Sequence, residues 1–185
     1  MYIDRDETNI IVLSRNRWGK TTLVKNILAK LPAYSAIIMD THNEYRIPQW
    51  TYNPHNVYGV MQLDRFIKYV TDNNKQFKHK LVVIDDIDVY KPTRSEQFYN
   101  YAISNAHYKN GVILIARRAI WLPKIIIGNA NYIIFSGAVP PEDIAYLQKC
   151  GISKSIVQKS YMLQPHEFFC YDTINREIEK MVTHV

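Results

Sequence analysis

Five short apolar runs, rich in β-branched residues, recur along the chain as far as Phe135. Each run is about one strand long and is apolar throughout, a pattern typical of strands that are buried on both faces of a sheet. The predicted strands are Asn9–Leu13, Ala36–Met39, Leu81–Ile84, Val112–Ile115 and Tyr132–Phe135.

The segments between these runs carry apolar residues at helical spacing. The three sets are Leu23, Val24, Ile27, Leu28 and Leu31; Val60, Leu63, Phe66, Ile67 and Val70; and Phe98, Ala102 and Ala106. Alternation of strand and helix predicts an α/β fold with a mostly parallel central sheet covered by helices on both faces.

Proline, serine and glycine residues set the expected helix ends. Pro32 stops the first helix, and Ser95, which follows Pro92, can cap the third. Pro140 and Pro141 open a further helix over Glu142–Cys150, which Gly151 ends. The segment from Phe168 to Val182 alternates around a turn at Asp172–Asn175 and predicts a C-terminal β-hairpin.

The bulk composition is that of one globular domain over residues 1–185, with 47% hydrophobic and 22% charged residues. The longest apolar runs are far shorter than the roughly 20 residues that span a bilayer, and no transmembrane segment is expected. The N-terminus shows no signal-peptide pattern, which favours a cytoplasmic location. Cys150 and Cys170 have no zinc-ligand spacing, and we assign them no role.

The formal net charge of +6 favours contact with a polyanion but does not establish it. Lys68, Lys75, Lys78 and Lys80 are candidates for contacts with DNA phosphates, although ordinary solvated lysines are the commoner explanation for such residues.

The first predicted strand is followed by Ser14-Arg-Asn-Arg-Trp-Gly-Lys-Thr-Thr22 and then directly by a helix. This matches the Walker A pattern, with Ser14 in place of the first glycine. In such a loop backbone N–H groups bind phosphate oxygens, a lysine reaches the terminal phosphates, and a hydroxyl binds Mg²⁺. We therefore predict an ATP site in which Lys20 contacts the β- and γ-phosphates and Thr21 binds the metal. The predicted nucleotide-binding residues are Asn16, Arg17, Trp18, Gly19, Lys20, Thr21 and Thr22.

The run Leu81–Ile84 ends in Asp85 and Asp86, the pattern of a Walker B strand. Asp85 is the expected second Mg²⁺ ligand. Asp86 stands where many P-loop ATPases have a glutamate that activates water, and aspartate is one methylene shorter. The alternative for Asp86 and Asp88 is that both are solvated acids at a strand end.

The strand over Ser35–Asp40 lies in sequence between the two Walker motifs. This favours the ATPases that place an extra strand between the P-loop strand and the Walker B strand in the sheet, rather than the simplest nucleotide kinases. The predicted fold is a three-layer, RecA-like P-loop NTPase with a C-terminal hairpin.

Two further segments resemble a known family. Asp40-Thr-His42-Asn-Glu44-Tyr45 resembles the D-x-H-x-E-Y signature of the HerA/FtsK-type DNA-pumping ATPases. The segment from Gly111 to Arg118, followed by Leu122-Pro123 and by the next strand, is similar to the family's sensor strand and its continuation. The resemblance covers about Asn9 to Gly151 and is nearest to the genome-packaging ATPases of membrane-containing icosahedral viruses, including archaeal ones.

The resemblance implies a ring, usually a hexamer, that threads double-stranded DNA and hydrolyses ATP at subunit interfaces, with capsid or membrane proteins of a virion as further partners. It makes Glu44 a candidate to polarise the lytic water; the alternatives are that Glu44 holds a neighbouring loop or is an ordinary solvated acid. His42 is expected to pack or to form a local hydrogen bond. Arg117 stands where the family has a sensor glutamine. The family's arginine finger often precedes the sensor strand, where this chain has no arginine, so Arg94, Arg117 and Arg118 are the candidates, each also a possible salt-bridge residue.

Three alternatives to a viral packaging motor stay open at this point. A small-molecule or nucleoside kinase would share the P-loop, although no cluster of lid arginines is evident. A cellular DNA translocase or helicase-like ATPase would share every motif. A nucleotide-dependent switch that assembles without efficient hydrolysis is consistent with Asp86 and Arg117.

Overall fold

The computed structural model describes residues 1–54, 58–137 and 139–183. Its eight strands form a single sheet in the order β3-β2-β4-β5-β1-β6-β7-β8. The strands are β1 (Asn9–Ser14), β2 (Ala36–Met39), β3 (Trp50–Tyr52), β4 (Lys80–Ile84), β5 (Asn110–Ala116), β6 (Tyr132–Ser136), β7 (Glu167–Asp172) and β8 (Ile178–Val182). Strands β1 to β6 pair in parallel, whereas β7 and β8 form the predicted antiparallel hairpin at one edge.

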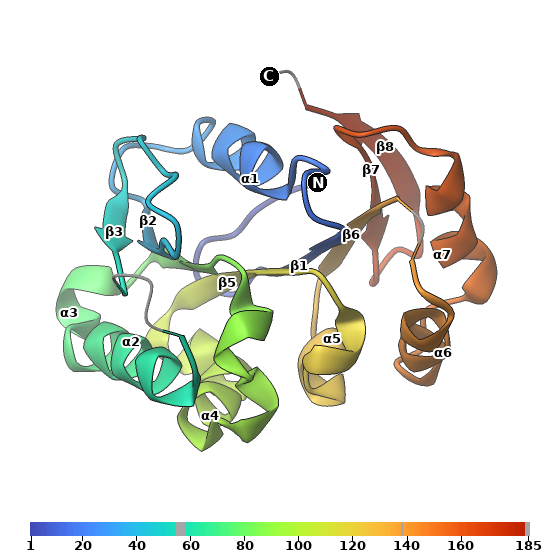
Figure 1. Ribbon diagram of the computed structural model, residues 1–185. Helices are drawn as coiled ribbons and strands as arrows, with labels where there is room; N and C mark the ends of the chain where they lie inside the picture. Colours follow the sequence, from blue (N-terminus) through green and yellow to red (C-terminus); the bar gives the residue numbers. More distant parts are fainter. Residues whose placement is uncertain (55–57, 138, 184–185) are drawn as a thin grey trace.

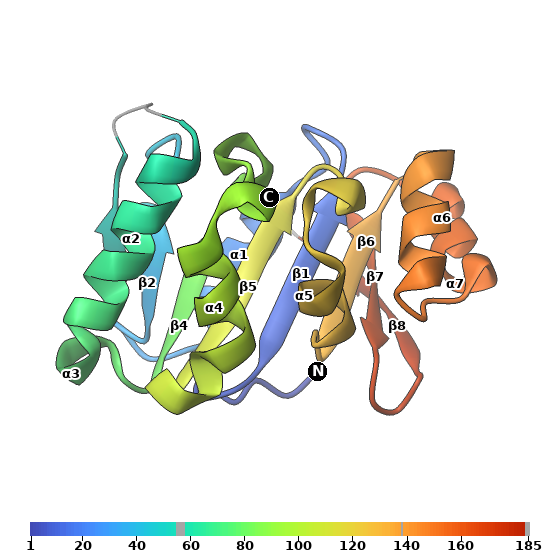
Figure 2. The same cartoon turned by 90° about the horizontal axis from the view of Figure 1, so that it is seen from below.

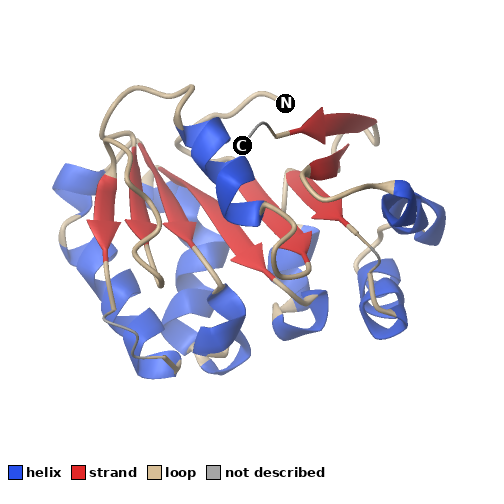
Figure 3. Ribbon diagram, turned by 45° about the horizontal axis from the view of Figure 1, so that its top comes forward, coloured by secondary structure: helices blue, strands red, loops and turns tan. Residues whose placement is uncertain are grey.

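The sheet is covered unequally on its two faces (Figure 1). Most helices lie on one face, and Figure 2 shows α2, α4, α5 and α6 side by side across it. Helix α1 (Lys20–Leu28) crosses the other face (Figure 3). The remaining helices are α2 (Val60–Asp72), α3 (Asn74–Phe77), α4 (Glu96–Ser104), α5 (Lys124–Gly128), α6 (Pro141–Lys149) and α7 (Lys154–Lys159).

Strands β1, β2, β4, β5 and β6 are mainly apolar because each contributes to two cores. Successive side chains of a strand point to opposite faces, so Ile11 and Leu13 of β1 join the core under α2, α4 and α5, while Ile10 and Val12 join the core under α1. The predicted three-layer α/β fold with a mostly parallel sheet is confirmed. Among the described residues, no helix has both the length and the apolar character needed to span a bilayer.

The sheet order confirms that a strand separates the P-loop strand β1 from the Walker B strand β4. The separating strand is β5, which carries the sensor-like segment, and β2 lies on the far side of β4. Because these strands are parallel, the segments that follow β1, β2, β4 and β5 all lie at one edge of the sheet, where ligands commonly bind in open α/β folds. The antiparallel β7 begins at that same edge.

Helix ends follow the sequence signals with two exceptions. The prediction that the first helix includes Leu31 and runs to Pro32 is wrong, because α1 ends at Leu28 and the next N–H groups, of Lys30 and Leu31, bond to carbonyls three residues back. Ser95 caps α4 by accepting a hydrogen bond from the backbone N–H of Phe98 at 2.9 Å. The prediction that α4 reaches Ala106 is wrong, because the helix ends at Ser104 and the 3₁₀ helix η3 (Asn105–Tyr108) follows. There the Asn105 side chain donates to the carbonyl of Asn110, a local side-chain bond of the kind that competes with helical pairing.

Candidate nucleotide site

The turn between β1 and α1 is closed around Gly19, which has a φ of 87°. A Cβ at this position would also lie 2.6 Å from Nδ1 of His166, so both conformation and space require glycine. Helix α1 has no capping side chain and no acidic residue in its first turn. Its first N–H groups are thus available to an anion, as in other phosphate-binding helix N-termini.

Lys20 lies at the start of α1 with 7% of its surface exposed. Its Nζ donates hydrogen bonds to the carbonyl oxygens of Ser14 and Arg15, each at 3.0 Å. Burial lowers the pKa of Lys20, while the nearby Asp86 and Asp85 carboxylates oppose that shift. The ammonium group is therefore held inside the loop by carbonyl groups that a phosphate could replace as partners.

Thr21 and Asp85 come together from α1 and the end of β4. The Thr21 hydroxyl donates to Oδ2 of Asp85 at 3.2 Å, and the backbone N–H of Asp86 donates to Oδ1 at 2.9 Å. Burial, with a further contribution from Asp86, raises the pKa of Asp85 to about 6. A hydroxyl and a buried carboxylate at this separation fit the oxygen ligands that Mg²⁺ takes.

No group of three or more His, Cys, Asp or Glu side chains within the described ranges could hold a metal ion by itself. In nucleotide sites Mg²⁺ is usually bound by one or two protein oxygens together with phosphate groups and water. Thr21 and Asp85 would be the protein's share of that shell.

Replacing Asp85 by asparagine is expected to stabilise the nucleotide-free protein above pH 6. The carboxyl has a raised pKa in the folded state, so its deprotonation costs folding free energy that accumulates as the pH rises from about 4 to about 6. Urea unfolding at pH 8 should give Asp85→Asn an advantage of about 3 kcal/mol, which disappears toward pH 4.

With Mg·ATP present the order should reverse, because only the wild-type carboxylate can bind the metal. An Asp85→Asn variant that is less stable than wild type at pH 8 without nucleotide would contradict this account of the site.

The loop after β2 is folded around Asp40, which is 1% exposed. Its two carboxylate oxygens accept hydrogen bonds from the backbone N–H groups of Glu44 and Tyr45, each at 2.9 Å. The hydroxyl of Thr41 donates to the carbonyl of Asp85 at 3.0 Å and so ties this loop to the end of β4. The structure thus gives the D-x-H-x-E-Y segment a physical role: Asp40 fixes the turn that carries His42 and Glu44.

His42 and Asp86 meet across this loop, with Nε2 of His42 at 3.1 Å from Oδ2 of Asp86. Asp86 adopts a left-handed conformation, with a φ of 47°, directly after the Walker B strand. Both residues and Glu44 line the same cavity. His42 bonds locally, as expected from the sequence, and its partner is one of the two candidate water-activating carboxylates.

Asp88 is not the solvated acid that the sequence left open. Its side chain is fully buried, and its Oδ2 accepts a 2.6 Å hydrogen bond from Nε of Arg117. Asp88 Oδ1 also accepts from the backbone N–H of Arg117 at 3.3 Å. Asp88 belongs to the 3₁₀ helix η1 (Ile87–Tyr90), which follows β4 and brings this carboxylate next to the end of β5.

These segments enclose a cavity of about 480 Å³. Nine of the predicted site residues line it: Asn16, Arg17, Gly19, Lys20, Thr21, Thr22, Glu44, Asp86 and Arg117. Asp85 lies beneath it, bonded to Thr21. His42 and His166 complete the lining, and His166 has no signal in its local sequence because it reaches the P-loop from just before the C-terminal hairpin.

Trp18 was predicted to bind nucleotide, but its indole packs against another partner. A Cβ on Gly137 would lie 3.2 Å from the Trp18 ring, so the ring covers the loop after β6. The carbonyl of Trp18 accepts a hydrogen bond from the backbone N–H of His166 at 3.3 Å. In this structure Trp18 holds the P-loop to its neighbours instead of lining the cavity.

The candidate arginine fingers differ in their surroundings. Nε of Arg118 donates to Oδ2 of Asp143 at 2.8 Å, and Nη2 lies 3.5 Å from Oε2 of Glu142, so both partners belong to the same chain. Arg94 is exposed at the end of the 3₁₀ helix η2 (Pro92–Arg94). The role of an arginine finger stays a prediction for all three arginines.

The candidate DNA-binding lysines also differ. Lys68 forms a 2.9 Å salt bridge with Asp72, one turn away on α2, and Nζ of Lys80 donates to the carbonyl of Tyr34 at 2.6 Å. Lys75 and Lys78 are exposed. A contact with DNA stays a prediction for all four.

Solved structures share this fold over nearly the whole chain. The genome-packaging NTPase B204 of Sulfolobus turreted icosahedral virus 2, solved with AMPPCP, is 17% identical with a TM-score of 0.80, covering 97% of this chain and 99% of that one. B204, described as the DNA-packaging ATPase of Sulfolobus turreted icosahedral virus, gives 19% identity and a TM-score of 0.79 over 99% of this chain and 100% of that one. The N-terminal domain of zonular occludens toxin from Neisseria meningitidis is 8% identical, with a TM-score of 0.62 over 97% of this chain and 94% of that domain.

No protein-family model and no curated protein sequence matches the chain. At these identities the structural likeness establishes the fold, and the predicted resemblance is confirmed at that level.

Proposed function

We propose that the protein is a magnesium-dependent ATPase, formed as one domain over residues 1–185. The observation that carries the proposal is that Lys20 and Thr21 line a cavity of about 480 Å³ and that the Thr21 hydroxyl lies 3.2 Å from the buried Asp85 carboxylate. Thr21 and Asp85 belong to two sequence motifs and are 64 positions apart in the chain. The B204 structures of the same fold include complexes with AMPPCP and ATP-γ-S, which supports a nucleotide as the ligand.

Each group at this edge of the sheet has a place in phosphoanhydride hydrolysis. The N–H groups at the start of α1 and the Lys20 ammonium would bind the phosphates and stabilise the charge that develops in the transition state. Bound Mg²⁺ would neutralise phosphate charge. Glu44 and Asp86 are the carboxylates able to orient or deprotonate the attacking water, and Asp86 is already engaged with His42.

We propose that hydrolysis drives the movement of double-stranded DNA, as in genome packaging by an archaeal virus. The B204 proteins named as packaging enzymes support this, because they match 97% and 99% of this chain. The net charge of +6 is consistent with a DNA partner. A ring of copies, with Arg94 reaching a neighbouring site, would complete such a motor. Its expected place is the host cytoplasm or the virion, where capsid or membrane proteins are possible partners.

The decisive test is ATP hydrolysis measured with and without double-stranded DNA, alongside the mass of the protein with nucleotide. We expect DNA to stimulate turnover, the stimulation to fall steeply as salt rises because phosphate contacts dominate, and an oligomer to form with ATP and Mg²⁺. Phosphate transfer to a nucleoside by a monomer would instead identify a kinase. Assembly with ATP but without turnover at any DNA concentration would identify a switch.

A further inference from the structure

The cavity has an end that the proposed hydrolysis does not use. Asp86, Glu44 and Arg117 follow β4, β2 and β5, which lie on one side of β1 in the sheet. His166 precedes β7, which lies on the other side of β1, beyond β6. The cavity therefore crosses the end of β1, with the carboxylates and Arg117 at one end and His166 at the other.

The imidazole of His166 is fixed against the P-loop. Its Nδ1 would be 2.6 Å from a Cβ on Gly19, so the ring occupies the space that the missing side chain leaves. The same Nδ1 lies 3.2 Å from the hydroxyl of Thr183, whose backbone N–H donates to the His166 carbonyl at 2.9 Å. Thr183 is only 4% exposed.

The backbone of His166 is constrained as well, with a φ of 69° that non-glycine residues seldom adopt. With Nδ1 turned toward Thr183, Nε2 and the ring face are the groups available to a ligand in the cavity. A histidine held at both its backbone and one ring nitrogen presents this surface in a fixed orientation, which lowers the entropy lost on binding.

We propose that His166 binds the nucleoside half of the nucleotide, meaning its ribose and base, and so extends the site beyond the phosphates. The inference rests on the proposed ATP site. If Lys20 holds the phosphates and the terminal phosphate faces Asp86 and Arg117, the nucleoside lies at the opposite end, beside His166. An aromatic ring with one free nitrogen can stack on a base and exchange a hydrogen bond with a ribose hydroxyl or a base edge.

The test compares two ligands that share the triphosphate. Calorimetric titrations of Mg²⁺-loaded ATP and of inorganic tripolyphosphate are run on wild type and on His166→Ala. We expect ATP to bind about fivefold or more weakly to the variant, the loss of one or two polar contacts, while tripolyphosphate binds both proteins within about twofold.

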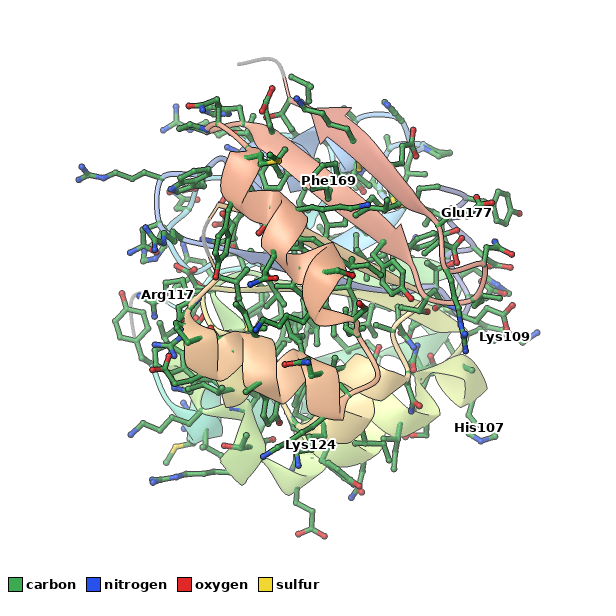
Figure 4. All side chains as sticks on the ribbon, turned by 90° about the vertical axis from the view of Figure 1, so that its right-hand side faces the viewer. His107, Lys109, Arg117, Lys124, Phe169 and Glu177 are labelled. Atoms are coloured by element: carbon green, nitrogen blue, oxygen red, sulfur yellow. The ribbon has the colours of Figure 1, made fainter. Side chains whose placement is uncertain are left out.

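The matched control is His107→Ala. His107 is exposed on η3, before β5, and Figure 4 places it on the opposite side of the molecule from Arg117, which follows β5. Both ligands should bind this variant as they bind wild type. If His166→Ala does not fold, as judged by its thermal midpoint without nucleotide, His166→Gln takes its place with the same expected selectivity.

An equal loss of affinity for ATP and for tripolyphosphate would overturn the proposal, because His166 would then contribute to phosphate binding and not to nucleoside binding. An unchanged affinity for ATP would overturn it too. Failure of the ATP site itself is distinguishable, since wild type would then bind neither ATP nor tripolyphosphate.

Discussion

Lys20→Ala should reduce the rate of ATP hydrolysis by on the order of 10³-fold, to a value close to the background rate. A loss of this size lies in the upper part of the range seen when one preorganised donor to a transition state is removed. The lysine is buried in the P-loop, and its Nζ is held by the carbonyl groups of Ser14 and Arg15. Arg17 and Arg117 also line the cavity, but neither stands at the start of α1, where Lys20 is the one cation in the first turn. The measurement is phosphate release at saturating Mg·ATP.

The matched control for this variant is Lys30→Ala, which removes an exposed lysine just beyond the other end of the same helix. It should hydrolyse ATP at the wild-type rate. Thermal unfolding of both variants without nucleotide distinguishes a loss of catalytic activity from a loss of folded protein. A Lys20→Ala variant that folds and keeps wild-type turnover would remove the assignment of the phosphate site.

The parts of the fold that could be predicted are those in which the residue pattern of one continuous segment identifies the element. The five buried strands agree with β1, β2, β4, β5 and β6 within two residues at each end, because burial on both faces makes them apolar throughout. Strand β3 could not be predicted in this way. It is a three-residue edge strand with two exposed residues, and its pairing with β2 defines it more than its composition does.

The same distinction separates the predicted from the missed parts of the site. The Walker A residues are consecutive, and Asp85 ends a recognisable strand, so the contact between Thr21 and Asp85 could be anticipated from the topology of a parallel sheet. The packing of His166 on Gly19 joins segments about 147 positions apart and depends on where the C-terminal hairpin docks. The glycine at position 19 is the one sign of this contact in the sequence, because it leaves space for another side chain. It does not indicate that His166 is the residue that fills the space.

The contact between Arg117 and Asp88 gives a structural reason for an arginine at position 117. Arg117 stands in the sensor position, where the resembling family has a glutamine. For Asp88 the sequence left open that it is a solvated acid. The structure joins the two, because the carboxylate of Asp88 is fully buried and the Arg117 guanidinium is its partner. Arg117 also extends to the cavity and stacks over Trp121 with its Cζ 5.8 Å from the ring centroid. Figure 4 shows Arg117 and Lys109, which flank β5, on opposite sides of the molecule.

Arg117→Gln, which introduces the glutamine of the resembling family, should therefore destabilise the protein by about 2 to 3 kcal/mol in urea unfolding at pH 7. Removal of one partner leaves a buried carboxylate without its counter-charge, which costs about 3 to 5 kcal/mol for a fully buried pair. The expected loss is smaller because the Arg117 side chain is 32% exposed and because the backbone N–H of residue 117 still donates to Asp88.

The double variant Arg117→Gln with Asp88→Asn supplies the control, since amide groups at both positions leave no unpaired charge. It should recover most of the lost stability, and the coupling between the two sites in the double-mutant cycle should exceed about 1 kcal/mol. Additive single effects would show that the 2.6 Å contact contributes little. Measured alongside, the hydrolysis rates separate the two roles of Arg117: a double variant that is stable but inactive would show that its guanidinium acts on the nucleotide as well as on Asp88.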